Sequence, residues 1–234
     1  ETFKESKMIL YMWDSIKNIP HIKEKFDYFD YIFSFDKNDC NSNHFIQFRP
    51  LFFCDEYQRD RNNQDCSYDL CFIGTIHSDR YKILKQINQE ATEKGLKTFF
   101  YPYLQSEFTY YFYKLFKSEF WGTKKSDFKY AKLSSKTISK IVDESNVIID
   151  IQHPKQTGLT MRTIEILGLR KKLITTNKDI QNYDFYNSNN IMIVDRENFV
   201  IDKNFFDKKF INLDEEIYNK YSLNSWINTL IGDE

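Results

Sequence analysis

The sequence predicts an α/β protein: a Rossmann-like, doubly wound parallel sheet accompanied by an incomplete second α/β domain. Short apolar, β-rich runs alternate with segments of helical periodicity from residue 69 onward, which is typical of consecutive βαβ units. The 234 residues include only six glycines and four prolines, which disfavours a loop-rich all-β module. With 41% hydrophobic and 18% aromatic residues, the chain has enough apolar surface to bury a core.

Residues 1–67 are expected to form part of an α/β domain. Apolar runs predict strands at 8–12 and 31–35, with a weak helix at about 18–27 between them. A third extended piece follows at 45–53. The charged segment 55–67 has almost nothing to bury, so we expect a linker there and a domain boundary near residue 67. Because the chain opens on Glu1 without an initiator methionine, we expect a fragment of a longer protein.

Residues 68–212 are expected to form the second, ligand-binding domain, and 213–234 a C-terminal helix that packs back. Apolar runs predict strands at 69–73, 97–101, 147–151, 172–175 and 191–194. Helical spacing predicts helices at 80–94, 108–120, 134–142, 160–169 and about 214–231. Ligands of such sheets bind beyond the carboxyl ends of the strands. The loops after three strands should therefore face one crevice: 74–80, 101–106 and 152–160.

Charge and cysteine content exclude several classes of function. The 33 basic and 34 acidic residues give a net charge of −1, which supplies no field for nucleic acid. No uncharged apolar run reaches the length of a membrane-spanning helix. The four cysteines contain no CxxC pair, so a structural zinc site is not expected. Cys71 lies inside an apolar strand and is expected to be a buried thiol of a cytoplasmic protein.

Several motifs are absent. The chain lacks the P-loop, GxGxxG, GxSxG and HExxH patterns, which disfavours P-loop, dinucleotide and common hydrolase chemistry. It also lacks the Asp-x-Asp motif that holds a metal–diphosphate in one class of sugar transferases.

The strongest positive signal is the strand–loop–helix segment at 147–169. The loop around Gly158 opens a helix whose first-turn amides and dipole favour a phosphate. Glu165, five residues into that helix, has a carboxylate that can accept hydrogen bonds from two ribose hydroxyls, and Arg162 can fork onto a phosphate. The alternative is that Arg162 and Glu165 form a solvated helix face and Gly158 a simple turn.

A second signal follows the strand at 69–73, where Gly74 lets a ligand approach the backbone and Arg80 starts a helix. The alternative is an ordinary packing turn with Ser78 or Asp79 as the helix cap.

Three other side chains are weaker candidates. His77 and His153 lie in crevice loops and either contact phosphate or are solvated. Asp14 follows the first strand and is either a catalytic base or a cap of its own turn.

The stretch 108–132 combines an aromatic stripe at helical spacing with six lysines against Glu119 and Asp127. Such a stripe is usually buried in a core. The alternative is peripheral contact with an anionic membrane surface.

Taken together, these segments resemble one family. KQTGLTMRTIEILGLRKKLITTN is similar to the donor-binding signature of GT-B glycosyltransferases that act on bacterial surface polysaccharides such as capsule and lipopolysaccharide. YDLCFIGTIHSDRYKIL resembles the first strand and loop of the same C-terminal domain, and YMWDSI with FDYIFSFDKND resembles the end of the N-terminal domain. The resemblance and the motifs together imply a donor-binding set: Gly74, Thr75, Arg80, Tyr101, Gly158, Leu159, Thr160, Arg162 and Glu165.

The resemblance implies transfer of a sugar from a nucleotide-diphosphate sugar to a glycan or lipid-linked acceptor. It also implies that residues 1–67 are part of the acceptor-side domain and that residues 68–212 are the nucleotide-sugar donor-binding domain. It implies no metal cofactor, and a cytoplasmic protein with peripheral contact at the inner membrane. Thr157 stands eight residues before Glu165, where many retaining members carry a glutamate, so retention or inversion stays open. The short N-terminal part and Thr157 favour an alternative, a non-catalytic nucleotide-sugar-binding or assembly subunit. A polyol-phosphate transferase on a similar scaffold is a third hypothesis.

Overall fold

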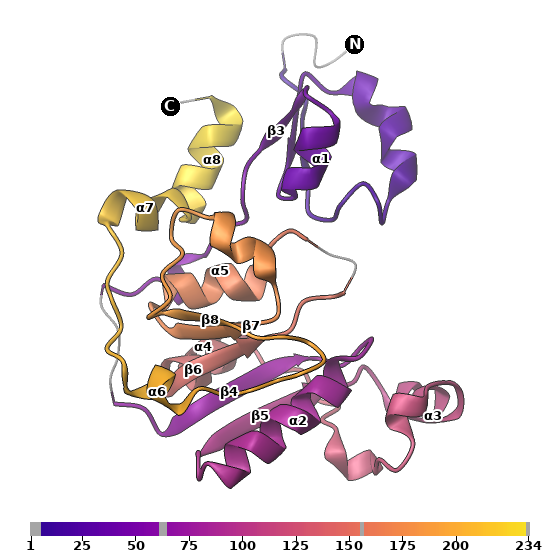
Figure 1. Cartoon of the computed structure of the whole chain (residues 1–234). Coiled ribbons are helices and arrows are strands. Elements are labelled where there is room, and N and C mark those ends of the chain that lie inside the picture. The colour runs from indigo at the N-terminus through magenta and orange to yellow at the C-terminus, as the bar shows by residue number, and fades with distance from the viewer. Residues whose placement is uncertain (1–5, 61–64, 155–156, 233–234) are drawn as a thin grey trace.

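The computed structural model describes residues 6–60, 65–154 and 157–232. Over these residues the strands form two parallel sheets, one in each of two units that lie one above the other (Figure 1). The smaller sheet has the order β1-β2-β3, and the larger has the order β5-β4-β6-β7-β8. The predicted α/β fold with parallel sheets is confirmed. The strands are β1 (Ile9–Met12), β2 (Tyr31–Ser34), β3 (Ile46–Phe48), β4 (Tyr68–Thr75), β5 (Thr98–Tyr103), β6 (Ser145–Asp150), β7 (Lys172–Thr175) and β8 (Ile191–Ile193).

Helices alternate with the strands along the chain. The α-helices are α1 (Lys37–Ser42), α2 (Arg80–Glu93), α3 (Glu107–Phe116), α4 (Ser135–Asp143), α5 (Met161–Gly168), α6 (Lys203–Asp207), α7 (Glu215–Lys220) and α8 (Leu223–Ile231). Short 3-10 helices cover Pro20–Tyr28, Asp55–Tyr57, Ser118–Phe120, Lys125–Asp127 and Lys178–Asn182. The helix expected at 214–231 is two helices, because the chain turns at Tyr221 and Ser222 caps α8. Within the described ranges, no helix is long and apolar enough to cross a bilayer.

The larger sheet is covered on both faces because successive strand residues point to opposite sides. Leu70 and Phe72 of β4 belong to one buried cluster together with Ile83 and Ile87 of α2. Their neighbour Cys71 belongs to the other cluster, with Val142 of α4 and Ile164 of α5. The alternation of side chains along each strand thus produces two cores, and both faces of the sheet are buried.

The segment at 55–67, expected to be a polar linker, begins with residues that pack against the larger unit. Residues 61–64 lie outside the described part of the chain. Asp55–Tyr57 forms a 3-10 turn, and Tyr57 is buried in the same core cluster as Phe53 and Ile164. Aromatic residues just before and inside the charged run therefore attach it to the larger unit. The domain bounds at 1–67, 68–212 and 213–234 remain predictions.

The C-terminal segment returns to the smaller unit, and α8 lies beside that unit at the top of Figure 1. The Arg49 guanidinium donates to the Lys220 carbonyl at 2.8 Å, and Phe53 exchanges backbone hydrogen bonds with Tyr221 and Leu223. The Trp226 ring on α8 contacts the rings of Tyr11, Trp13 and Phe52.

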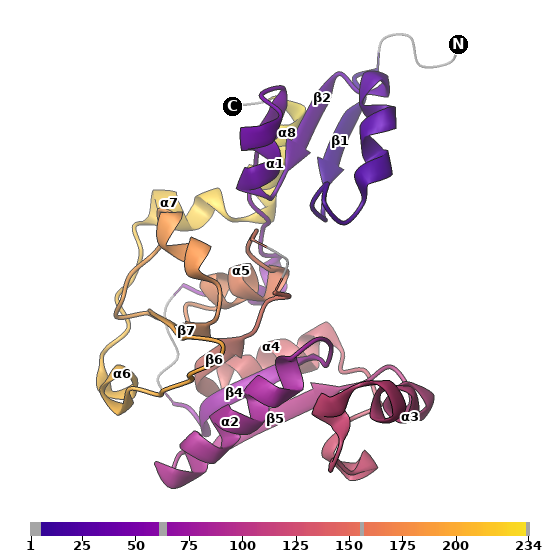
Figure 2. The same cartoon turned by 45° about the vertical axis from the view of Figure 1, so that its right-hand side comes forward.

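The aromatic stripe of 108–120 is not buried in the core, so that prediction is wrong. Phe108 is 79% exposed and Leu115 is 72% exposed, whereas Tyr110 and Phe120 are buried. Helix α3 projects outward from the side of the molecule formed by β4 and β5 (Figure 2). Tyr110 and Phe120 anchor it, and most of its apolar side chains face outward.

A close approach of α5 to the segment at 53–57 gives the first testable prediction. A Cβ atom at Gly168 would lie 2.7 Å from both Phe53 Cγ and the Tyr57 carbonyl oxygen. Alanine normally stabilises a helix relative to glycine, but here the clash should reverse the sign. We expect Gly168→Ala to lower the free energy of unfolding by about 2 kcal/mol. Urea denaturation measures this, with Lys85→Ala on the exposed side of α2 as control. Equal or greater stability of Gly168→Ala would contradict the packing.

Candidate functional site

The order of the larger sheet places a ligand crevice between β4 and β6. The chain adds β5 on one side of β4 and then crosses to add β6 on the other. Ligands of doubly wound sheets bind where the strand order reverses in this way. Pairing of β4 with β5 continues to Thr75 and Tyr103, but pairing of β4 with β6 stops at Cys71 and Ile148. The carboxyl ends of β4 and β6 are therefore not hydrogen-bonded to each other.

Two arginines bridge this gap. The guanidinium of Arg80, at the start of α2, donates to the Thr75 carbonyl at 2.7 Å and also to the Ile151 carbonyl. Arg196, beyond β8, forms an ion pair with Asp79 at 2.8 Å and donates to the Gln152 carbonyl. These contacts fix the loops after β4 and β6. The predicted donor residue Arg80 thus bonds the backbone on both sides of the crevice.

A cavity of about 240 Å³ opens at the carboxyl ends of β4 and β5. It brings together four of the predicted donor residues: Gly74, Thr75, Tyr101 and Arg162. The other residues that line it are Ile73, Tyr103, Lys132, Leu133 and Ile138. The sequence analysis missed Lys132, Leu133 and Ile138 as site residues. Their positions in the sequence could have identified them. They lie just before α4 and in its first half, and this places them at the same edge of the sheet as Tyr101.

Behind this cavity, Arg162 and Glu165 form an ion pair on α5 with a nitrogen–oxygen distance of 2.7 Å. Their side chains are only 20% and 17% exposed, so they do not form a solvated helix face. Burial raises the pKa of Glu165 above its ordinary value, and the positive charge of Arg162 and a hydrogen bond with Tyr57 offset only part of this rise. The pair places a hydrogen-bond acceptor and a fixed positive charge beside the cavity.

The amino end of α5 is satisfied by the protein itself. The Thr160 hydroxyl accepts from the Thr163 amide, and the hydroxyls of both residues donate to the Asp150 carboxylate at 2.6 and 2.7 Å. Asp150, missed by the sequence analysis, ends the apolar strand β6 and places a negative charge at the positive end of the helix dipole. Gly158 and Leu159 are buried beside it, and none of Gly158, Leu159 and Thr160 lines the cavity.

The loop before α5 contacts the smaller unit. The Thr157 hydroxyl donates to the Asp36 carboxylate at 3.0 Å and accepts from the Asn38 amide at 2.9 Å. A Cβ at Gly158 would lie 2.5 Å from the Phe35 ring. A glycine at 158 therefore permits a close approach between the two units.

Asp14 caps the turn that follows β1. Its Oδ1 atom accepts from the Ser15 amide at 2.9 Å and from the Asn18 side chain at 2.7 Å. Asp14 is not among the residues that line the cavity. Its role as a base remains a prediction.

His77 and His153 face each other across the β4–β6 gap, with ring centroids 5.5 Å apart. Burial and then the positive charge of Arg80 lower the pKa of His77 to about 4. His77 is therefore neutral at pH 7, and a hydrogen bond of 3.1 Å joins it to Ser78.

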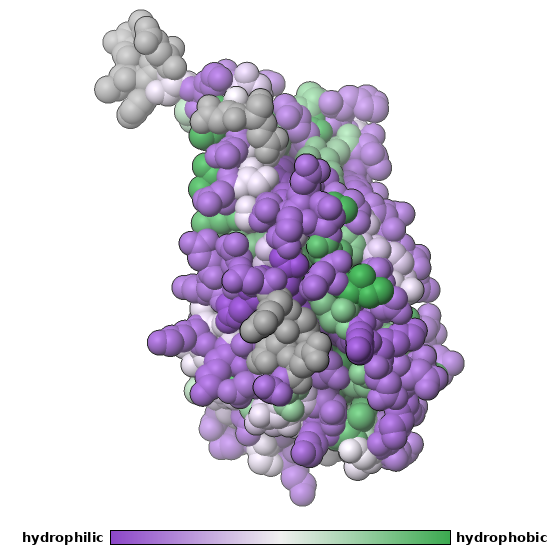
Figure 3. Space-filling model, turned by 90° about the vertical axis from the view of Figure 1, so that its left-hand side faces the viewer, coloured by the Kyte–Doolittle hydropathy of each residue, from purple (hydrophilic) through white to green (hydrophobic). Residues whose placement is uncertain are grey.

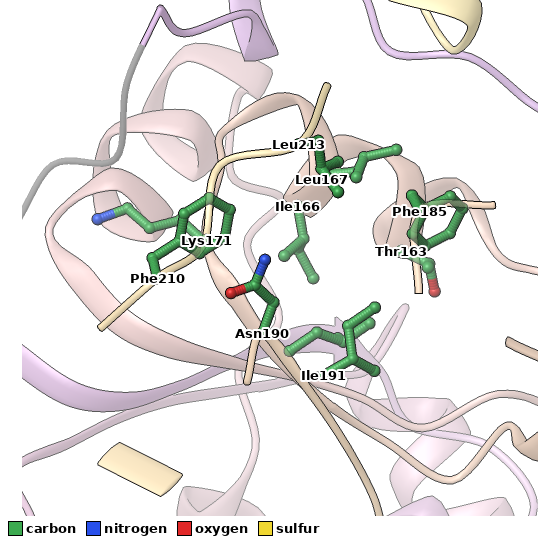
Figure 4. Close-up of a pocket in the computed structure, with 10 residues that line it drawn as sticks. Thr163, Ile166, Leu167, Lys171, Phe185, Asn190, Ile191, Phe210 and Leu213 are labelled. Atoms are coloured by element: carbon green, nitrogen blue, oxygen red, sulfur yellow. The ribbon is translucent and has the colours of Figure 1, made fainter. Parts of the chain in front are cut away.

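A second, much smaller cavity lies between α5 and β8 (Figure 4). Its volume is about 20 Å³, and mainly apolar side chains such as Ile166, Phe185 and Leu213 line it. This is room for about one water molecule, so we regard it as a packing void. Among the described residues, no three His, Cys, Asp or Glu side chains are grouped so that they could hold a metal ion.

Comparisons with known proteins found distant similarities of fold. No protein-family model matches the chain, and no curated protein matches it. The C-terminal domain of a glycosyl transferase group 1 family protein (LpcC) from Francisella tularensis is 12% identical, with a TM-score of 0.38. The match covers 76% of this chain and 94% of that one. A chain of the GtfA/B complex is 10% identical, with a TM-score of 0.47, and the match covers 96% of this chain and 44% of that one.

The half-buried imidazole of His77 predicts a loss of stability in acid. Its folded pKa of about 4 lies below its ordinary value of 6.5, so the unfolded chain binds more protons between these values. Stability should therefore be full above pH 6.5 and fall as the pH drops toward 4. The loss should be on the order of 1 kcal/mol, because the ring is partly exposed. Unfolding at several pH values, compared with His77→Gln, isolates this contribution. Identical pH profiles for the two proteins would contradict it.

Proposed function

We propose that the chain is the donor-binding part of a glycosyltransferase that moves a sugar from a nucleotide-diphosphate sugar to a glycan or lipid-linked acceptor of surface polysaccharide synthesis. The observation that carries the proposal is the cavity at the carboxyl ends of β4 and β5, lined by Arg162, which is paired with Glu165. Apolar surface and positive charge line the cavity. The Glu165 carboxylate is not among the lining residues and lies next to them as the ion-pair partner of Arg162.

The apolar part of the cavity suits a nucleobase. Tyr101 from β5 and Leu133 and Ile138 around the start of α4 line it. The Tyr101 hydroxyl donates to the Ala131 carbonyl at 2.9 Å, which holds the phenol ring in place. A planar base buried against such a surface gains hydrophobic and stacking free energy.

The Arg162–Glu165 pair suits a ribose phosphate. A carboxylate can accept hydrogen bonds from two vicinal hydroxyls, and a guanidinium can bind a phosphate through two parallel hydrogen bonds. Without ligand, the two charges neutralise each other over 2.7 Å. A ligand that carries both donor hydroxyls and anionic oxygens can replace each partner of the pair, so that neither charge is left buried alone.

The diphosphate would lie near Gly74 and Thr75, with Arg162 and Lys132 as its positive groups. Both basic residues line the same cavity as the Gly74 backbone. Fixed positive charge in a partly buried site stabilises the leaving diphosphate as the sugar–oxygen bond breaks. We propose that this charge serves in place of a bound metal, and that the transferase acts in the cytoplasm.

A second candidate is a non-catalytic nucleotide-sugar-binding or assembly subunit on the same fold. The observation that favours it is that the Thr157 hydroxyl is hydrogen-bonded to Asp36 and Asn38 of the smaller unit. This side chain joins the two units and brings no second carboxylate to the donor.

Calorimetric titration with UDP-, GDP-, CDP- and TDP-sugars tests the donor site. We expect one of the four to bind, and Glu165→Gln and Arg162→Ala each to weaken it more than about tenfold, a loss of about 1.4 kcal/mol or more. Glu144→Gln is the matched control, because Glu144 also forms a helix ion pair, with Lys140. Its affinity should equal that of the wild type. No binding of any nucleotide sugar, or an unchanged affinity of Glu165→Gln, would contradict the donor site.

Turnover separates the two candidates. A donor that binds and is consumed only when acceptor is present supports the transferase. Binding without turnover on the full-length protein, with acceptor present, supports the binding subunit.

A further inference from the structure

Helix α3 carries an apolar surface on its outer side. Phe108, Tyr111, Phe112 and Leu115 recur at the spacing that places them on one face of a helix, and all four are exposed. Together with their exposed neighbours they form what we call the aromatic surface: Phe108, Tyr111, Phe112, Leu115, Phe116 and Trp121. Soluble proteins rarely leave an apolar patch of this kind uncovered.

The helix that carries this surface is firmly held from its inner side. Ser106 caps α3 by accepting from the Thr109 amide. The buried Tyr110 donates to the Thr123 carbonyl at 2.9 Å, and Lys114 donates to the same carbonyl. The Phe120 ring is fully buried between aromatic neighbours. The outward position of the aromatic surface is therefore fixed by contacts on the opposite side of the helix.

The segment that carries the aromatic surface also carries six lysines: Lys114, Lys117, Lys124, Lys125, Lys129 and Lys132. Lys114 bonds on the inner side of α3, Lys125 pairs with Glu107 and Lys132 lines the candidate donor cavity, whereas Lys124 and Lys129 are exposed. Two of the three acidic residues nearby are engaged. Glu107 pairs with Lys125 at 3.0 Å, and Asp127 accepts from the Lys124 amide at 2.9 Å. The aromatic surface also differs in hydropathy from the face of the molecule shown in Figure 3, which is mainly hydrophilic.

We propose that the aromatic surface docks on an anionic lipid bilayer. Phenyl, indole and leucine side chains enter the region between headgroups and acyl chains, and the lysines face lipid phosphates. The lysine-rich rim favours this partner over a protein, because protein interfaces are depleted in lysine. Since α3 follows β5 directly, docking would hold the carboxyl edge of the larger sheet close to the membrane surface.

Vesicle co-sedimentation of the whole chain tests the proposal. We expect binding to phosphatidylcholine vesicles that contain about 30% phosphatidylglycerol and at least about tenfold weaker binding to phosphatidylcholine alone. Binding should also fall as the salt concentration rises. Equal binding to both vesicles without an effect of salt would overturn the proposal.

Two pairs of variants locate the surface. Phe112→Ser with Leu115→Ser should reduce vesicle binding about tenfold or more. The matched control is Val200→Ser with Ile211→Ser, which are also exposed apolar residues, and it should bind like the wild type. Lys124→Glu with Lys129→Glu should likewise reduce binding at least tenfold, since each lysine near the surface contributes about a fivefold change. Lys203→Glu with Lys209→Glu is its control.

Circular dichroism establishes that each variant is folded. If the apolar double variant does not fold, the variant of the two exposed lysines still tests the proposal. Unchanged binding of both α3 variants would overturn the proposal, as would an equal loss in the two controls. Analytical ultracentrifugation tests whether a second copy of the chain covers the aromatic surface instead. The proposal would also be overturned if the protein formed dimers without lipid and the double variant Phe112→Ser with Leu115→Ser were monomeric.

Discussion

The guanidinium of Arg80 replaces the hydrogen bonds that β4 and β6 lack at their carboxyl ends. Pairing between these strands stops at Cys71 and Ile148, and Arg80 then joins the Thr75 and Ile151 carbonyls across the gap. Without it, the carbonyl of the buried Ile151 would lose a charged donor, which costs about 1–3 kcal/mol for a buried group left unpaired. The strands can therefore separate enough to form a crevice while the loops beyond them stay fixed.

The position of the candidate site follows from this constraint. The loop after β4 is held by Arg80, so Gly74 and Thr75 present a defined wall to the cavity. Helix α5 supplies the opposite wall, and its position depends on Asp150 at its amino end and on the contact of Gly168 with the segment at 53–57. The smaller unit contacts the loop before α5 through Asp36 and Phe35, although the cavity itself is lined by the larger unit.

The sequence predicted the framework well because apolar runs report burial directly. The eight strands found in the described part of the chain lie where such runs occur, and Tyr101 and Arg162 line one cavity as their positions after or near strand ends suggested. The sequence could not show that Asp150 satisfies the start of α5, or that Arg80 bonds carbonyls, because both depend on distances across the sheet. It also left open which side of α3 faces outward, since spacing defines a face and not what covers it.

The central claim is that the cavity between β4, β5 and α5 binds a nucleoside diphosphate. Crystal structures of the protein with UDP, GDP, CDP and TDP test it most directly. We expect a base against Tyr101 and Leu133, with ribose hydroxyls on the Glu165 carboxylate and phosphate oxygens on Arg162. A nucleotide bound elsewhere, for example in the groove beside α2 lined by Tyr81 and Lys85, with the Arg162–Glu165 pair intact, would contradict it.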